Sequence, residues 1–186
     1  GAECVWVSVF TAISAFCNAG FDLFGRFGAY SSLVPYVNNY YVQAVIMFMI
    51  MAGGLGFMVW VELAEYRKKR RLSLHAKVVL QFSVIFWVGG AVLLALLEWS
   101  NPRTMGGLSV PGKIMAALFQ SVSTRTAGMN TIDLAACSPI SKLLMSVLQF
   151  IGAAPGSTGG GVKVTTFAVL ILTIRSVAQG RDDCVI

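Results

Sequence analysis

The chain has 186 residues, of which 56% are hydrophobic and only 12% are charged, and its mean hydropathy is +0.75. A soluble domain carries about 25% charged residues because its surface must be wetted, and a disordered chain has an even lower apolar content. The four cysteines are far apart and form no CxxC pair, so we expect reduced thiols rather than a disulfide scaffold or a metal site. The composition therefore predicts an all-α membrane protein.

The net charge of +6 is concentrated in one basic segment rather than spread over the chain. Five consecutive basic residues occupy positions 67–71, with long apolar segments on both sides. No aromatic residues interleave with them, which argues against nucleic-acid binding. A short basic segment between two apolar spans is typical of a cytoplasmic loop, here residues 67–75, and contact with anionic lipid is the alternative.

Two apolar segments are long enough to cross a bilayer core of about 30 Å. The first runs over residues 40–66, and the second over residues 76–99. The glycines inside them, in Gly53-Gly54-Leu55-Gly56 and Gly89-Gly90, are typical of close helix packing. With the basic segment inside the cell, the first span descends, the second ascends, and residues 101–111 form an external loop.

Two other apolar segments are too short to cross, which favours re-entrant helices. They cover residues 5–16 and 113–123, and each is followed by a loop with a glycine. Phe10-Thr11 through Ser14 align with Phe119-Gln120 through Ser123 at an offset of 109, and residues 18–21 align with residues 126–129 at an offset of 108. This internal repetition predicts a unit of span, short pore helix, glycine loop and span.

The last apolar stretch, residues 139–175, would be about 55 Å long as one helix, which exceeds what a bilayer requires. Its middle, residues 152–163, contains a proline, five glycines and Lys163. We expect two helical pieces joined by an irregular loop at membrane depth, called the Gly-rich loop below, and such an interruption is typical of a transport pathway. The loop does not fit a phosphate-binding motif, because Val162 separates Gly161 from Lys163.

A short re-entrant helix followed by a glycine loop is the architecture of an ion selectivity filter. A cation that leaves water needs oxygen ligands in place of its hydration shell, and backbone carbonyls supply them. Glycine permits backbone conformations that turn these carbonyls toward one axis. The predicted filter residues are Asn18, Ala19, Gly20, Phe21, Thr126, Ala127, Gly128 and Met129.

Three segments together resemble the Trk/Ktr/HKT superfamily of potassium transporters, most closely the bacterial Ktr-type transmembrane potassium-uptake subunit. They are residues 14–22, 124–130 and 154–163. The resemblance implies four repeats around one potassium pathway, with Gly20 and Gly128 as the filter glycines of the second and third repeats. It also implies that the Gly-rich loop is a gate, formed by Gly156, Ser157, Thr158, Gly159, Gly160, Gly161 and Lys163.

The same resemblance implies how the chain is organised. Residues 1–66 would hold the second repeat's pore helix, filter and second span, residues 76–175 the third repeat, and residues 176–186 a cytoplasmic tail. The chain would then be an internal fragment of a multi-pass protein of the bacterial inner membrane. The family further implies a homodimer on a cytoplasmic ring of nucleotide-binding regulatory subunits.

Several single residues allow two interpretations. Lys163 either acts in gating or extends to the inner membrane face. Asp22 and Asp133 either concentrate cations at the filter mouth or cap turns, whereas we expect Arg125 to brace the filter loop through backbone carbonyls and His75 to be interfacial. No catalytic arrangement or cofactor site is predicted, so the chain is not expected to be an enzyme. Potassium is the expected cargo, with sodium as a candidate modulator. The alternatives to potassium uptake are a sodium-permeable or proton-coupled relative and a membrane assembly subunit without transport.

Overall fold

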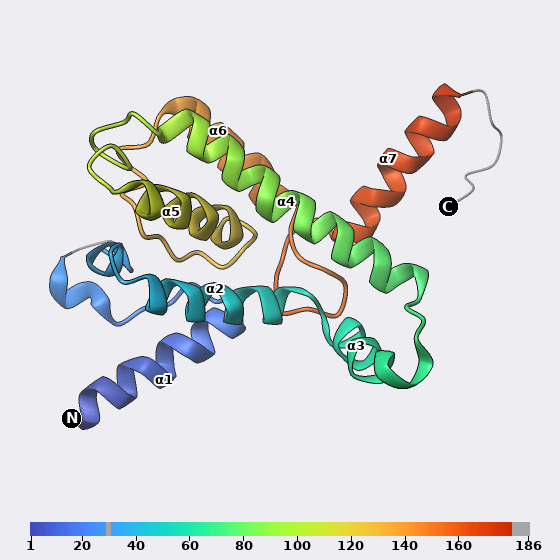
Figure 1. Ribbon diagram of the computed structural model, residues 1–186, viewed down its shortest axis with the longest axis horizontal. Helices are drawn as coiled ribbons and strands as arrows, with labels where there is room; N and C mark the ends of the chain where they lie inside the picture. Colours follow the sequence, from blue (N-terminus) through green and yellow to red (C-terminus); the bar gives the residue numbers. More distant parts are fainter. Residues whose placement is uncertain (29–30, 180–186) are drawn as a thin grey trace.

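In the computed structural model, which describes residues 1–28 and 31–179, the chain is a series of helices joined by irregular segments (Figure 1). Within the described residues, the β-type backbone pairing is an isolated bridge between Ile151 and Val162. The elements are α1 (Ala2–Phe16), the 3-10 helices η1 (Phe24–Phe27) and η2 (Val34–Tyr36), α2 (Tyr40–Gly54), α3 (Phe57–Lys69), α4 (Leu74–Glu98), α5 (Val110–Ser123), α6 (Pro139–Phe150) and α7 (Val164–Ala178).

Four of the helices begin at a side-chain cap that the sequence supplies. In each, the cap oxygen accepts a hydrogen bond from a backbone N–H of the first helical turn, which otherwise has no partner within the helix. Pro111 and Pro139 occupy the first helical turns of α5 and α6, where a missing N–H costs nothing. The cap residues are Asn39 for α2, Ser73 for α4, Ser109 for α5 and Ser138 for α6.

The long helix α4 organises the fold, because α3, α5, α6 and α7 all contact it. Helix α2 contacts α1 on one side and α5 on the other, so that α5 lies between α4 and α2 (Figure 1). Helix α5 is the most enclosed of these elements, and the fully buried Phe119 and Val122 belong to a core shared with α1 and α2. The two short predicted pore helices, α1 and α5, are thus joined through α2.

Helix α4, with 25 residues, is long and apolar enough to cross a membrane, as predicted for residues 76–99. The span predicted over residues 40–66 is not one straight helix. This stretch forms α2 and α3, which pass the same test only as a pair and are bent by 98° where they meet.

The bend between α2 and α3 has a clear backbone cause. Gly56 adopts a φ of +85°, which an L side chain rarely adopts. The helical hydrogen bonds are replaced here by bonds to the Gly-rich loop: Thr158 N–H donates to Gly53 O (3.2 Å), and Phe57 N–H donates to Gly156 O (3.1 Å). Ala154 N–H likewise donates to the carbonyl of Gly54 (3.0 Å). The loop therefore satisfies backbone groups on both sides of the bend.

The close packing predicted for the mid-span glycines is present at Gly53, Gly90 and Gly56, where a Cβ atom on Gly56 would lie 2.6 Å from Pro155 O. A Cβ atom on Gly53 would overlap Phe16 O, and a Cβ atom on Gly90 would overlap the Ser121 side chain. Around Gly89, in contrast, a Cβ atom would have no neighbour within 4 Å.

The basic segment differs from the predicted loop at residues 67–75. Arg67, Lys68 and Lys69 form the last turn of α3, and α4 already begins at Leu74, so the connection is confined to residues 70–73. The carboxylate of Glu62 fixes this turn, because both Ser73 N–H (2.8 Å) and the Ser73 hydroxyl (2.7 Å) donate to it. Cations in a last helical turn suit the negative end of the helix dipole, which favours helix over loop here.

Candidate functional site

The two predicted filter glycines lie directly against each other. Both adopt the left-handed conformation, with φ of +75° at Gly20 and +79° at Gly128. A Cβ atom on Gly20 would lie 2.8 Å from Ala127 O, and one on Gly128 would lie 3.3 Å from the Cα of Gly20. Segments 108 residues apart in the sequence are therefore in backbone contact, and glycine is required at that contact.

The two loops also share an unusual backbone pattern. Asn18 and Thr126 each precede the glycine by two residues, and both have positive φ, +50° and +75°. Below, residues 17–22 are called the Gly20 loop and residues 124–130 the Gly128 loop. Positive φ at alternate residues is rare outside glycine, so its occurrence in both loops supports the internal repeat seen in the sequence.

The hydrogen bonds that hold the two loops correspond as well. Ser14 Oγ donates to Phe21 O (2.6 Å), and Ser123 Oγ donates to Met129 O. The backbone N–H groups of Ala19 and Ala127 donate to the carbonyls of these same serines, each at 2.9 Å. Each loop thus turns back on the last turn of its preceding short helix.

The predicted filter residues differ in exposure. Ala127 and Met129 are buried, Asn18, Gly20 and Thr126 are half-buried, and Ala19, Phe21 and Gly128 are exposed. A cavity of about 500 Å³ borders Thr126, Gly128 and Met129, with Gln120 and Gln149 in its lining. The Gly128 loop therefore faces an open, partly polar space.

Asp22 and Asp133 act as turn residues. Asp22 Oδ1 accepts from Phe24 N–H and Asp133 Oδ1 accepts from Ala135 N–H, each at 2.9 Å, two residues further along the chain. This is the local bond that Asp commonly makes in turns. Of the two interpretations of these carboxylates, the structure shows the turn role.

The Gly-rich loop doubles back on itself between α6 and α7, and Figure 1 shows it extending from the middle of α4 toward the junction of α2 and α3. Gly152 N–H donates to Val162 O (3.0 Å), and Ala153 N–H donates to Gly160 O (3.2 Å). Lys163 Nζ donates to Gly159 O (2.7 Å). The side chain of Lys163 therefore stabilises the loop's own turn.

Side chains tie the Gly-rich loop to both glycine loops. Asn18 Nδ2 donates to Thr158 Oγ1 (2.8 Å), and Gly160 N–H donates to Thr126 Oγ1 (3.1 Å). The hydroxyl of Thr158 donates in turn to Phe16 O (2.8 Å), the carbonyl of the last residue of α1. All three segments singled out in the sequence thus meet in one place.

Arg125 binds the Gly-rich loop rather than its own loop. Its buried guanidinium donates from Nη2 to Gly152 O (2.7 Å) and lies over the rings of Phe86 (5.5 Å) and Trp87 (5.8 Å) on α4. The expected contact with backbone carbonyls is present, but the carbonyl belongs to residue 152. Arg125 therefore joins α4, the Gly128 loop and the Gly-rich loop.

We expect Arg125→Met to lower the free energy of unfolding by about 2–3 kcal/mol, because it removes a charged hydrogen bond and two cation–π contacts. Arg125→Lys, which keeps a donor but cannot cover both rings, should lose less. Thermal unfolding in detergent would measure both, with the exposed Arg103→Met as control. An Arg125→Met protein as stable as the wild type would mean that the cost of burying the charge cancels its contacts.

The structure also contains, at the end of α4, a buried polar cluster that the sequence did not reveal. Glu98 is fully buried, and its carboxylate accepts four hydrogen bonds. Nothing in the local pattern distinguishes it, because its partners are 3 to 43 positions away. They are Asn101 Nδ2 (2.7 Å), Thr104 Oγ1 (2.7 Å), Ser138 N–H (2.8 Å) and Ser141 Oγ (2.5 Å).

The cysteines among the described residues do not form a cluster at this site. Cys4, Cys17 and Cys137 are free thiols, and Cys184 lies outside the described residues, as does most of the predicted tail at 176–186. Burial, aided by the nearby charge of Glu98, raises the pKa of the Cys137 thiol to about 11. Cys137 is therefore protonated at neutral pH and acts as a core residue.

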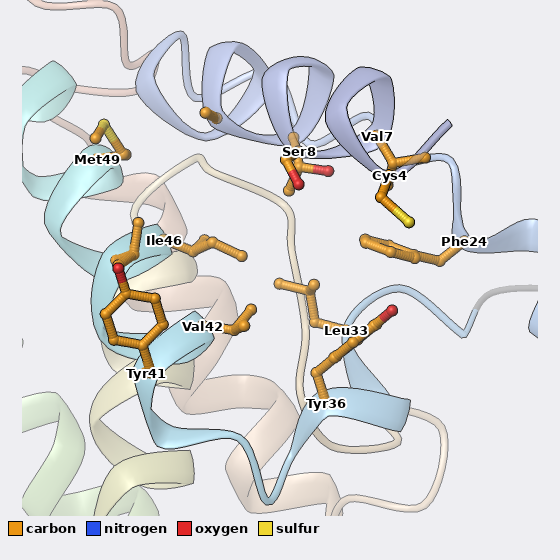
Figure 2. A pocket seen from close by; sticks show the side chains of 13 residues that line it. Cys4, Val7, Ser8, Phe24, Leu33, Tyr36, Tyr41, Val42, Ile46 and Met49 are labelled. Carbon is orange, nitrogen blue, oxygen red and sulfur yellow. The ribbon is translucent and has the colours of Figure 1, made fainter. Parts of the chain in front are cut away.

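A second cavity, of about 350 Å³, lies away from the glycine loops (Figure 2). It lies between parts of α1 and α2, and Figure 2 shows Val7, Phe24, Leu33 and Ile46 at its lining. Within the described residues its lining holds no charged side chain. This apolar space is not a candidate ion site.

Comparisons with known proteins agree with these observations. The family model for TrkH, a cation transport protein, matches residues 1–184. The chain is 36% identical over 180 residues to the potassium/sodium uptake protein NtpJ of Enterococcus hirae, and 41% identical over 170 residues to the Ktr system potassium uptake protein B of Vibrio alginolyticus. These alignments cover 97% and 90% of this chain but 39% and 36% of the relatives, so the chain spans about two fifths of their length.

A solved structure shares the fold of this chain. The crystal structure of the potassium transporter TrkH from Vibrio parahaemolyticus superposes with a TM-score of 0.72 over 93% of this chain and 36% of that protein, at 22% sequence identity. At this identity the match establishes the fold. With the family match over nearly the whole sequence, the chain belongs to the TrkH family of membrane cation transport proteins.

Proposed function

We propose that this chain is the central part of a potassium-uptake protein, in which the Gly20 and Gly128 loops form two sides of a selectivity filter. The observation that carries this proposal is the contact between the two loops, with matching positive φ at residues 18 and 126 and at Gly20 and Gly128. Two loops of the same backbone shape, each at the end of a short helix, suit a ring of repeats around one axis.

In this proposal the ligands of the ion are the backbone carbonyls of residues 18–21 and 126–129. Carbonyl rings replace the hydration shell of potassium without any charged side chain. The carboxyl ends of α1 and α5 carry partial negative charge beside these loops, which favours a cation there. Potassium is the transported ion, no resident cofactor is needed, and sodium acts as a modulator.

The Gly-rich loop is proposed to gate this pathway, with Gly156–Gly161 as its moving part and Lys163 holding its turn. Its support is that the loop binds both glycine loops and the last carbonyl of α1. Gly156 and Gly161 have φ of +66° and +75°, so the loop depends on glycine at both turns.

The remaining parts of the proposal concern the intact protein. Two further repeats would complete a four-repeat pore, in a multi-pass protein of the bacterial inner membrane that forms a homodimer. The exposed basic end of α3, residues 67–71, is the proposed cytoplasmic contact for a ring of nucleotide-binding regulatory subunits, which would account for its concentrated positive charge.

Complementation would test the transport function directly. We expect the complete gene to restore growth of a potassium-uptake-deficient host at low external potassium. Isotope uptake with potassium and sodium in competition would separate a potassium-selective protein from a sodium-permeable relative. A well-expressed protein that gives no rescue would contradict uptake and favour an assembly role without transport.

Neutralising Lys163 should raise potassium flux. Lys163→Met in the intact protein removes the bond to Gly159 O, and the loss of one such bond shifts an opening equilibrium by about fivefold. Lys77→Met, at an exposed position of α4, is the matched control. Flux equal to that of the wild type would count against a gating role for Lys163.

A further inference from the structure

The contact between the filter and the gate is made by side chains at one repeated position. Asn18 and Thr126 are 108 residues apart, both precede a filter glycine by two residues, and both have positive φ. Each uses its side chain to hold the Gly-rich loop, Asn18 through Thr158 Oγ1 and Thr126 through Gly160 N–H. Resting on the proposed function, we infer that Asn18, Thr126 and Thr158 are positioning residues that hold the gate closed against the filter.

Thr158 is the centre of this arrangement, because it makes three hydrogen bonds, two to residues 16–18 and one to α2. Its hydroxyl accepts from Asn18 Nδ2 and donates to Phe16 O, and its N–H donates to Gly53 O. The approach is close enough that only glycine fits at residue 53, since a Cβ atom there would overlap Phe16 O and lie 2.8 Å from Thr158 Oγ1. Thr158 is therefore closely packed between α1 and α2, and this binding position of the Gly-rich loop is called its seat below.

The bond to Phe16 O gives this seat a specific consequence for ions. The last carbonyls of a helix lack partners within the helix and carry its partial negative charge, so they attract cations. In this structure the Phe16 carbonyl accepts a hydrogen bond from the Thr158 hydroxyl. The loop thus supplies a donor to a helix-end carbonyl two residues before Asn18, in the segment that leads into the proposed filter.

Asn18 and Thr126 also connect the gate to the filter backbone itself. Their positive φ is part of the shape of each glycine loop, and their side chains are part of the seat of the Gly-rich loop. A change in the backbone of residues 18–20 or 126–128 would therefore also move the side chains that hold the Gly-rich loop.

Thr158→Val in the intact protein tests this inference, because valine keeps the shape and removes the hydroxyl. We expect potassium flux in proteoliposomes to rise about 5–30-fold, the shift that follows from losing two hydrogen bonds. Thr158→Ser, which retains the hydroxyl, should behave like the wild type, as should Thr173→Val on the exposed face of α7. The preference for potassium over sodium should stay unchanged, because the filter carbonyls are intact.

A measurement without ions keeps the inference separate from the proposed function. Amide hydrogen exchange of residues 152–163 should become faster in Thr158→Val and remain slow in Thr173→Val. If the wild-type protein carried no potassium but Thr158→Val still exchanged faster, the transport function would be refuted. The inference that Thr158 holds the Gly-rich loop in place would then still stand. Wild-type flux together with wild-type exchange in Thr158→Val would overturn the inference.

Asn18→Gly provides a second variant if Thr158→Val does not accumulate. Glycine keeps the positive φ of residue 18 and removes only the bond to Thr158 Oγ1. We expect about a fivefold rise in flux for this single bond. Because both substitutions remove the same bond, the double variant should not exceed Thr158→Val alone, and fully additive effects would contradict a shared contact.

Discussion

Replacing Gly20 with alanine is expected to reduce potassium uptake by the intact protein at least about tenfold, because the left-handed conformation alone costs an alanine about 1–2 kcal/mol. The new Cβ atom would also lie 2.8 Å from Ala127 O, in the opposite loop. This contact is with backbone, so the loops must separate to relieve it. Separation displaces the carbonyls that are proposed to replace the ion's hydration shell.

The same change at Gly128 should have a smaller effect. Its φ of +79° carries a similar cost, but its added Cβ atom would meet only the Cα of Gly20, at 3.3 Å. Gly89→Ala on α4, where a Cβ atom would have no neighbour within 4 Å, is the matched control. The concentration dependence of uptake, with and without sodium, would measure all three. Normal uptake in Gly20→Ala, or a more severe defect in Gly128→Ala, would contradict the filter assignment.

Replacing Glu98 with alanine is expected to lower the free energy of unfolding by roughly 4–5 kcal/mol, because each stranded donor costs about 1–3 kcal/mol. Glu98 is fully buried, and it connects the end of α4 to the loop that follows it and to the first turn of α6. Four donors would lose their acceptor at once. The amino-terminal end of α6 also loses the negative charge that its dipole favours.

Glu98→Gln should be less severe, since its amide keeps one oxygen for the four donors. Thermal unfolding in detergent and the yield of folded protein would measure both variants. Glu65→Gln is a suitable control, because the Glu65–Lys69 ion pair is exposed to solvent and should contribute little to stability. If Glu98→Ala unfolded at the wild-type temperature, the buried cluster would not be a structural anchor.

Much of the helix pattern was predictable because its signals are local. Prolines 111 and 139 and the serine caps mark where α5 and α6 begin. A proline and five glycines mark the interruption between α6 and α7. Gly20 and Gly128 were predicted as filter glycines because the same short segment occurs twice, and the structure brings both copies into contact.

The bend and the side-chain contacts were not predictable from local sequence. Gly53-Gly54-Leu55-Gly56 is compatible with a packed straight helix and with a bend, and the choice depends on residues 154–158, about a hundred positions away. The bond between Asn18 and Thr158 spans 140 positions. Glu98 likewise gains its partners only when α6 is in place.

The bend between α2 and α3 depends on the Gly-rich loop through one pair of backbone groups. Gly53 O and Phe57 N–H are four residues apart, so they would bond to each other in an unbroken helix. In the bent structure Thr158 N–H and Gly156 O take their places. Inside a bilayer neither group can be left without a partner. The Gly-rich loop thus supplies partners for the two backbone groups that a straight α2–α3 helix would pair with each other, so the bend is stabilised by a segment about a hundred residues away.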